Sequence, residues 1–282
     1  MVVLNLPGST PARRRLARIV RDRDCDVAEA ALLCCVEVEP DLDVDGELLR
    51  VDALADRLRT SGFEPSGPRR DAKALGTYLG ETLGFVGDHE SYHDPQNALL
   101  TRVLDRRRGL PITLAILYMA VGSRVGIRAH GIATPGHFLV GVGPVPDAEE
   151  AVVIDPFHGG AVVTEHEIDQ RIQQATGGMS RLHRGMLSPA PPVQVVRRLL
   201  NNLTRDFLAQ GDTEDALWTV ELKRLLPDTG VEDARVAGQL LVQLGRYRSA
   251  AETVEAFVAE VGDSVDADEL SRLALRARAK MN

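Results

Sequence analysis

Three short segments in the middle of the chain carry side chains whose types and order could support nucleophilic catalysis. Gly109–Pro111 precedes a long apolar run, His137 opens an apolar segment, and Asp155 ends the next apolar segment. A histidine held by a carboxylate is the usual base and orienter for an activated nucleophile. A helix that begins beside this pair would add free N–H groups and partial positive charge, which lower the pKa of a thiol. The order therefore indicates a helix start, a base and an orienter.

The elements that must position these side chains are a buried helix and a short sheet. Residues 111–124 are almost all apolar, and Pro111 suits the first helical position because its missing N–H would have no partner there. Three β-type runs follow, separated by turns rich in Pro and Gly: residues 127–133, 137–143 and 151–157. This order predicts an α+β core. If the second and third strands are antiparallel neighbours, His137 and Asp155 should lie within hydrogen-bonding distance.

Helical periodicity flanks this core on both sides. The first 85 residues contain stretches with apolar residues at i, i+3 and i+4, and the spacing after residue 188 is helical again. We therefore predict three parts: a helical N-terminal region over residues 1–85, the α+β core with a short antiparallel sheet over residues 86–188, and an all-α tail over residues 189–282.

The tail contains an internal repeat. Gly211 aligns with Gly245 and Ala216 aligns with Ala250, each pair being 34 residues apart. Thirty-four residues is the tetratricopeptide period, in which a turn residue ends the first helix and a small residue lets the second helix pack closely. Such arrays bind peptides on a concave helical surface. The sequence therefore predicts a protein or peptide partner that binds through residues 189–282.

The middle of the chain resembles the transglutaminase-like, papain-type core, and more closely the SirB family of bacterial proteins. The resemblance is carried by residues 92–127, by Pro-Gly-His-Phe-Leu-Val at 135–140, and by Ile-Asp-Pro-Phe-His-Gly-Gly at 154–160. It implies a transglutaminase-like core joined to a tetratricopeptide-type tail. It also implies that His137 occupies the position of the family's base and that Asp155 occupies the position of the orienter.

The nucleophile position departs from this resemblance. Active transglutaminase-like enzymes open the helix with Gly-x-Cys, whereas this chain has Gly109-Leu110-Pro111. The nearest hydroxyl is that of Thr113, which lies on another face of the predicted helix. The three cysteines, Cys25, Cys34 and Cys35, lie far upstream around an apolar helical stretch, where burial makes a thiol inert. We therefore expect no thiol-dependent acyl transfer or proteolysis.

Two functions from different classes remain open. The first is a non-catalytic binding or regulatory module, a pseudoenzyme that binds proteins through its cleft and its tail. The second is a hydrolase or acyltransferase that uses the cleft of His137 and Asp155 with a nucleophile other than cysteine, such as Thr113, water or a metal-bound group. A metal held by His93, Asp94, His137 and Asp155 is a third hypothesis, but the spacing is loose for a metal site, so no cofactor is expected.

The candidate residues also have structural interpretations. The candidate catalytic pair is His137 and Asp155, and the candidate binding residues are Tyr92, Asp94, Asn97, Arg108 and Thr113. Three of the binding residues fall in one segment that resembles a capping and Asx-turn cluster before a helix. Arg108 is expected to pair with a nearby acid. His158 is interpreted as a turn residue that faces solvent.

The composition narrows the partner classes. The chain has 282 residues, a formal net charge of −8, 44% hydrophobic residues and 26% charged residues. These fractions are typical of a globular protein, and the negative charge argues against nucleic acid or anionic lipid as a partner. The sequence shows no secretory signal and no apolar run of about 18 residues, so we expect a cytoplasmic protein that does not enter a membrane.

Overall fold

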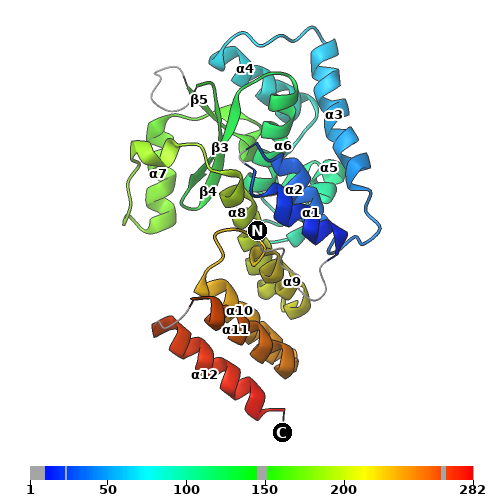
Figure 1. Cartoon of the computed structure of the whole chain (residues 1–282). Helices are drawn as coiled ribbons and strands as arrows, with labels where there is room; N and C mark the ends of the chain where they lie inside the picture. The colour runs from blue at the N-terminus through cyan, green and yellow to red at the C-terminus, as the bar shows by residue number, and fades with distance from the viewer. Residues whose placement is uncertain (1–9, 23, 145–150, 262–264, 282) are drawn as a thin grey trace. The chain divides into compact units, whose positions relative to one another are not determined.

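Two units make up the part of the chain that the structure describes. A computed structural model places residues 10–22, 24–144, 151–261 and 265–281, coloured along the chain in Figure 1. One unit spans residues 22–199, and the other combines residues 1–21 with residues 200–282. The three-part division expected from the sequence, with boundaries after residues 85 and 188, stays a prediction.

The larger unit begins with helices, as the sequence predicts. They are α2 (Val27–Cys35), α3 (Val44–Thr60), α4 (Pro68–Leu75), the π-helical continuation η1 (Gly76–Thr82), the 3-10 turn η2 (Pro95–Ala98) and α5 (Leu100–Arg106). Aspartates begin two of them, because the Asp26 carboxylate accepts from the Ala28 N–H and the Asp43 carboxylate accepts from the Gly46 N–H. Two-residue strands β1 (Val86–Gly87) and β2 (Arg108–Gly109) pair in parallel just before the central helix.

The central helix α6 (Pro111–Arg124) is buried along nearly its whole length. Its residues from Pro111 to Gly122 are all buried, which agrees with the apolar run read from the sequence. Pro111 occupies the start of the helix, where a missing N–H leaves no bond unmade, and Leu110 is the N-cap. No side chain caps this end of the helix in the structure.

A four-stranded antiparallel sheet follows α6. Its strands, in spatial order, are β3 (Ala129–Thr134), β4 (His137–Val142), β5 (Val152–Asp155) and β6 (Ala161–Val162). Thr134 pairs with His137, and Val140 pairs with Ile154, which fixes the register of the first three strands. The predicted α+β fold with a short antiparallel sheet is thus confirmed.

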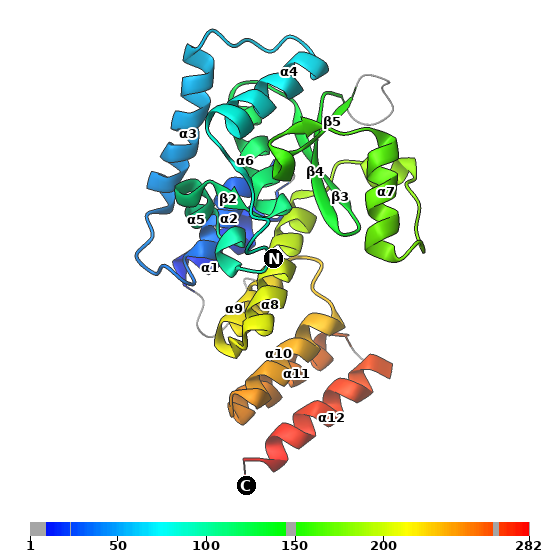
Figure 2. The same cartoon turned by 180° about the vertical axis from the view of Figure 1, so that it is seen from behind.

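Each face of the sheet is covered by a helix. Figure 2 shows α6 and α7 (Glu165–Thr176) on opposite sides of the sheet. The face toward α6 packs so closely that a Cβ on Gly131 would lie 2.7 Å from the ring of Phe138. The other face forms an apolar cluster with α7: Ile132, Leu139, Val163, Ile168 and Ile172. The 3-10 turn η4 (Arg184–Leu187) packs against this cluster, whereas the 3-10 turn η3 (Pro156–His158) contacts α6, β1 and η1.

The second unit is all-helical. It contains α1 (Pro11–Ile19), the end of α8 (Pro192–Gln210), α9 (Thr213–Lys223), α10 (Val231–Gln243), α11 (Tyr247–Val261) and α12 (Val265–Ala279). Gly211 and Gly245 each follow a helix in the left-handed region, with φ of 83° and 72°. Ala216 and Ala250 are each 0% exposed, so the predicted burial of Ala250 is confirmed.

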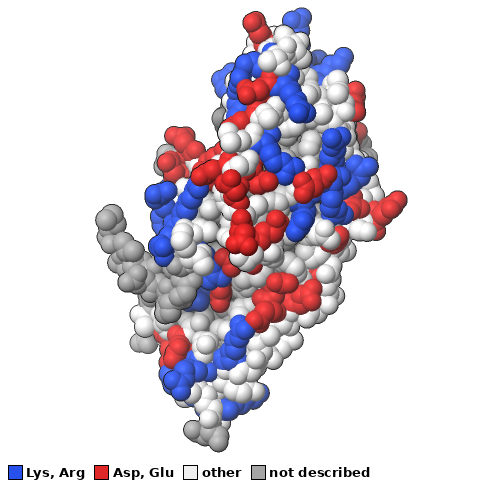
Figure 3. All heavy atoms as spheres, turned by 90° about the vertical axis from the view of Figure 1, so that its right-hand side faces the viewer, with Lys and Arg blue, Asp and Glu red and all other residues white. Residues whose placement is uncertain are grey.

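The described surface is charged and mixed in sign. On the face shown in Figure 3, Lys and Arg side chains alternate with Asp and Glu side chains, and neither sign forms a continuous field. Within the described residues, no helix combines the length and the apolar character that crossing a bilayer requires.

Candidate functional site

His137 and Asp155 meet at one end of the sheet. His137 is the first residue of β4, Asp155 is the last residue of β5, and these two strands are antiparallel neighbours. His137 Nε2 lies 3.0 Å from Asp155 Oδ1, so the predicted contact between the two side chains is confirmed. The Asp155 side chain is 0% exposed and the His137 side chain is 14% exposed. With Nε2 on the carboxylate, the Nδ1 atom of His137 remains for a second partner.

Asp155 is also held by three further groups. The Phe157 N–H donates to Oδ1 at 3.0 Å, His158 Nδ1 lies 2.7 Å from Oδ2, and the Arg171 guanidinium donates to Oδ2. A carboxylate has about four lone-pair sites, and here four donors surround it. The buried carboxylate is therefore a hub that ties β4, η3 and α7 together.

The charge of Asp155 follows from these contacts. Burial acts to raise the pKa of Asp155, but the hydrogen bond and charge of His137 oppose burial, and the hydrogen bonds from His158 and Arg171 add to this effect. The net result is a pKa well below the usual aspartate range. Asp155 is thus ionised at neutral pH and is able to orient an imidazole.

Sequence reasoning did not find two members of this hub. The sequence predicts that His158 is a turn residue facing solvent; its side chain is 46% exposed, but its Nδ1 atom lies 2.7 Å from Asp155 Oδ2. Its position three residues after Asp155 in an Asp-Pro-Phe-His turn was the available signal. Arg171 lies 16 residues downstream on α7, where nothing in the local sequence indicates its role.

The start of α6 offers no nucleophile to this pair. Pro111, at the position where the family's cysteine is expected, is a buried residue without a reactive atom. The Thr113 hydroxyl is buried and has no hydrogen-bond partner among the described residues. The Tyr118 hydroxyl is in the same state, and burial, aided by the negative charges of Asp155 and Glu81, raises its pKa. Thr113 therefore lies in the core and makes no hydrogen bond to His137.

The cysteines are in unreactive surroundings. Cys34 and Cys35 lie buried in α2, and burial raises the pKa of both thiols. Burial, together with Asp26 and Glu29, raises the pKa of Cys25 to about 12. A thiol is nucleophilic as a thiolate, so these three side chains stay protonated and inert at neutral pH.

The segment before α5 is a folded turn, as its capping interpretation predicts. Asp94 begins η2, where its carboxylate accepts from the Gln96 N–H at 2.9 Å. Asn97 is fully buried and donates to the Ser91 carbonyl at 2.7 Å. Both residues serve this turn in the structure, and a binding role for them stays a prediction.

Tyr92 and Arg108 differ in their relation to the hub. The Tyr92 ring contacts the Phe157 ring edge-on at 5.7 Å, and Phe157 in turn lies 6.1 Å from the His137 ring. Arg108 donates to the Gly84 carbonyl at 3.0 Å, so its partner is a backbone oxygen rather than the acid expected from the sequence. Of these two residues, Tyr92 is thus the one that the structure connects to the hub through an aromatic contact.

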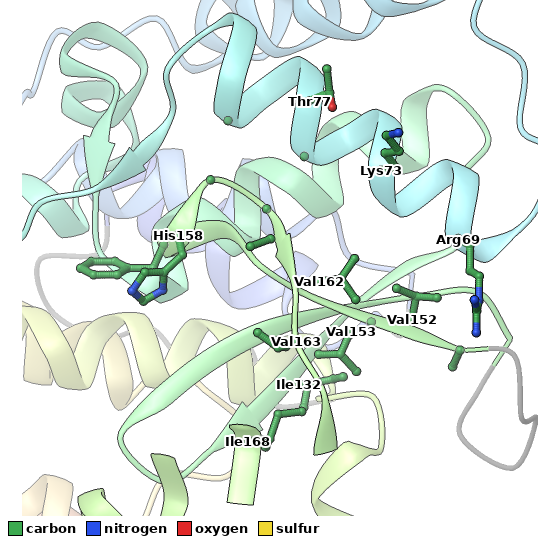
Figure 4. Close-up of a pocket in the computed structure, with 18 of the residues that line it drawn as sticks. Arg69, Lys73, Thr77, Ile132, Val152, Val153, His158, Val162, Val163 and Ile168 are labelled. Carbon is green, nitrogen blue, oxygen red and sulfur yellow. The ribbon is translucent and has the colours of Figure 1, made fainter. Parts of the chain in front are cut away.

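A cavity of about 1220 Å³ opens beside the hub. His158 and Phe157 line one part of it, and β6 forms one wall. A stripe at four-residue spacing on α4 and η1 forms the other wall: Arg69, Lys73, Thr77 and Glu81. Figure 4 shows Arg69, Lys73 and Thr77 on this helix across from Val162 of β6. Val162 is 58% exposed and lines this cavity.

The glycines next to this cavity let two backbones touch. A Cβ on Gly80 would lie 2.0 Å from the Gly159 carbonyl oxygen, and a Cβ on Gly76 would lie 2.6 Å from the Gly160 carbonyl oxygen. Any larger residue would push η1 away from the turn that carries His158. The glycines therefore fix the position of the His158 turn against the helix.

Comparisons with known proteins agree on the middle of the chain. A family model described as the transglutaminase-like superfamily matches residues 47–201. A UPF0162 protein of Xylella fastidiosa (strain Temecula1) is 35% identical over 237 residues, which cover 82% of each chain. A UPF0162 protein of Vibrio cholerae serotype O1 is 28% identical over 241 residues, covering 84% of this chain and 88% of that protein.

Among solved structures, a crystal structure of menin that reveals its binding site for the Mixed Lineage Leukemia protein matches with a TM-score of 0.44. The two are 14% identical, and the match covers 93% of this chain and 73% of that one.

Proposed function

The chain belongs to the transglutaminase-like superfamily and to the UPF0162 proteins, and from this starting point we propose that it is a non-catalytic member that binds other proteins. In this proposal the cleft beside His137 and the helical tail both contact partners. The SirB-type assignment and the tetratricopeptide character of the tail belong to the same proposal.

One observation carries the proposal: the residues at the family's base and orienter positions are in contact, but the residue at its nucleophile position is a proline. His137 and Asp155 are hydrogen-bonded at 3.0 Å, yet Pro111 begins the helix that would supply the thiol. A helix N-terminus lowers the pKa of a thiol only where a thiol is present. In this proposal the hydrogen-bonded pair holds β4 and β5 together beside the cavity.

The tail supports binding through its repeat. The helix pairs α8–α9 and α10–α11 are each joined by a turn with a left-handed glycine, and these glycines are 34 residues apart. The alanines at the same offset are buried in both pairs. This pattern favours two tetratricopeptide-type units closed by α12.

The cavity supports peptide binding because the edge strand β6 forms one of its walls. β6 is the last strand of the sheet, and the Val163 N–H donates to the Val153 carbonyl at 2.9 Å. Bonded and non-bonded positions alternate in an antiparallel pair, so the N–H and C=O of Val162 are directed away from β5. An extended peptide could pair with this edge and place its side chains in the cavity.

We expect no thiol-dependent acyl transfer or peptide hydrolysis by the purified full chain. The physical reason is that Pro111 has no reactive atom and that the three thiols are held protonated. The measurement is an acyl-transfer and peptidase assay before and after treatment with a thiol-alkylating reagent. Turnover that alkylation abolishes, and that Cys34→Ser or Cys35→Ser also abolishes, would overturn the proposal. Turnover that resists alkylation but is lost in His137→Ala would favour the hydrolase or acyltransferase alternative.

Peptide binding at β6 has its own test. We expect selection from a displayed library of random peptides to yield ligands whose affinity, measured by fluorescence anisotropy, falls about tenfold or more in Val162→Asp. Leu49→Asp is the matched control, because Leu49 is a similarly exposed apolar residue, at 67%, on α3 and outside the cavity lining. Equal affinity for Val162→Asp and wild type, or no selected peptide at all, would contradict binding at this strand.

A further inference from the structure

Asp155 is bonded by two imidazoles, although orienting a base requires only one. His137 Nε2 lies 3.0 Å from Oδ1, and His158 Nδ1 lies 2.7 Å from Oδ2. The available atoms of these three residues all lie within 4.8 Å of one another. The second imidazole has no part in a base and orienter pair, and the sheet is already held by His137 and Arg171. It therefore calls for a separate explanation.

We propose that His137, Asp155 and His158 form a binding site for a divalent transition-metal ion, with zinc as the best-fitting ion. This inference departs from the expectation that the chain uses no metal. It also replaces the earlier ligand hypothesis, because His158 takes the place of His93 and Asp94. The site stands independently of peptide binding and of any catalytic activity.

The spacing of the three ligands suits a small ion. Zinc binds imidazole nitrogen at about 2.0–2.1 Å and carboxylate oxygen at about 2.0–2.2 Å, which puts tetrahedral ligand atoms about 3.4 Å apart. The two distances from Asp155 to the imidazoles, 3.0 and 2.7 Å, are hydrogen-bond lengths somewhat shorter than this value, and all the available atoms of the three residues lie within 4.8 Å of one another, so small side-chain shifts would let an ion replace the two hydrogen bonds. His158 is 46% exposed and lies in a short turn, so it is the ligand that can shift to make room for the ion.

The donor set selects the kind of ion. Two imidazoles and one carboxylate suit zinc, cobalt, nickel or ferrous iron, whereas magnesium and calcium prefer sets made of oxygen alone. Three protein ligands leave a fourth position open. His158 lines the cavity, so this position is accessible to water or to a carboxylate of a molecule in the cavity.

The surroundings of Asp155 provide the outer support that metal sites use. The Phe157 N–H and the Arg171 guanidinium both bond the carboxylate, which fixes its orientation toward the imidazoles. The positive charge of Arg171 also repels the metal ion, which lowers the affinity of the site. The combination predicts a site that is well oriented but has only moderate affinity.

Isothermal titration calorimetry of the full chain with zinc chloride, after removal of metals with a chelator, tests this site. We expect one equivalent to bind to wild type, and His158→Ala to weaken binding by at least about 10–100-fold, the loss found even for residues that only support a metal ligand. His166→Ala is the matched control, because His166 is an exposed histidine of α7 outside the cluster, and it should bind zinc as wild type does. Magnesium chloride should give no heat above dilution.

A spectroscopic measurement distinguishes this site from adventitious binding by surface histidines. Cobalt chloride should produce visible d–d absorption bands in wild type and in His166→Ala, and zinc should displace them. The bands should be lost in His158→Ala, which is expected to fold because the side chain is half-exposed. Wild type without zinc binding, or His158→Ala with the affinity and bands of wild type, would overturn the proposal.

Discussion

Replacing Asp155 with alanine should lower the free energy of unfolding of the α+β unit by about 3–5 kcal/mol at pH 7. The change removes the acceptor of His137, His158, Arg171 and the Phe157 N–H at a position with 0% exposure. Donors left without an acceptor inside a protein keep their desolvation cost. Because the Arg171 side chain is 31% exposed and regains some hydration, we expect a value near the lower end. Urea unfolding followed by circular dichroism measures the loss.

The matched control is Asp56→Ala. Asp56 pairs with Arg59 at 2.6 Å, but both side chains are more than half exposed, at 61% and 55%. Exposed ion pairs contribute little, so we expect almost no change in the free energy of unfolding. Asp155→Asn should still be destabilising although it keeps the volume, because an amide cannot accept from all four donors. Similar losses in Asp56→Ala and Asp155→Ala would show that the hub is not specially stabilising.

The same carboxylate should make stability depend on pH. The folded pKa of Asp155 is depressed below the unfolded value of about 3.9. Its contribution is therefore fully present above the unfolded pKa and is lost as pH falls toward the folded pKa. Wild type should lose stability below about pH 4 more steeply than Asp155→Ala.

The elements around the site were predictable because their signals are local. A continuous apolar run with proline at its start identified α6, and short β-type runs bounded by Gly and Pro identified β3, β4 and β5. The contact between His137 and Asp155 followed from adjacent antiparallel strands. The strands, the core helix and the contact between His137 and Asp155 were therefore predictable from short segments of the sequence.

The rest of the hub was not predictable because it depends on packing between distant elements. Arg171 reaches Asp155 only because α7 covers the sheet face that contains Ile132 and Leu139. His158 reaches Asp155 because the Gly159–Gly160 turn touches η1 at Gly76 and Gly80. The sequence alone shows His158 as a polar residue in a turn, which is interpreted as facing solvent, and it gives no local signal that Arg171 on α7 reaches Asp155.

In the helical tail, Ala250→Glu should lower the free energy of unfolding by about 3–5 kcal/mol. Ala250 is 0% exposed on α11, which packs against α10 and α12. The larger side chain must separate these helices, and its carboxylate would be buried without a partner. The tail also packs tightly elsewhere, since a Cβ on Gly238 of α10 would lie 2.6 Å from Val254 of α11.

Trp218 provides a specific probe for this change, because it is the single tryptophan of the chain and lies on α9 in the same unit. Its fluorescence should report an earlier unfolding transition in urea for Ala250→Glu. Ser249→Glu adds the same side chain one residue away at an exposed position of α11, and it should leave the transition unchanged. If both variants unfold like wild type, Ala250 does not pack between the helices of the repeat. If both unfold early to the same extent, added charge on α11, rather than burial at the repeat position, is the cause.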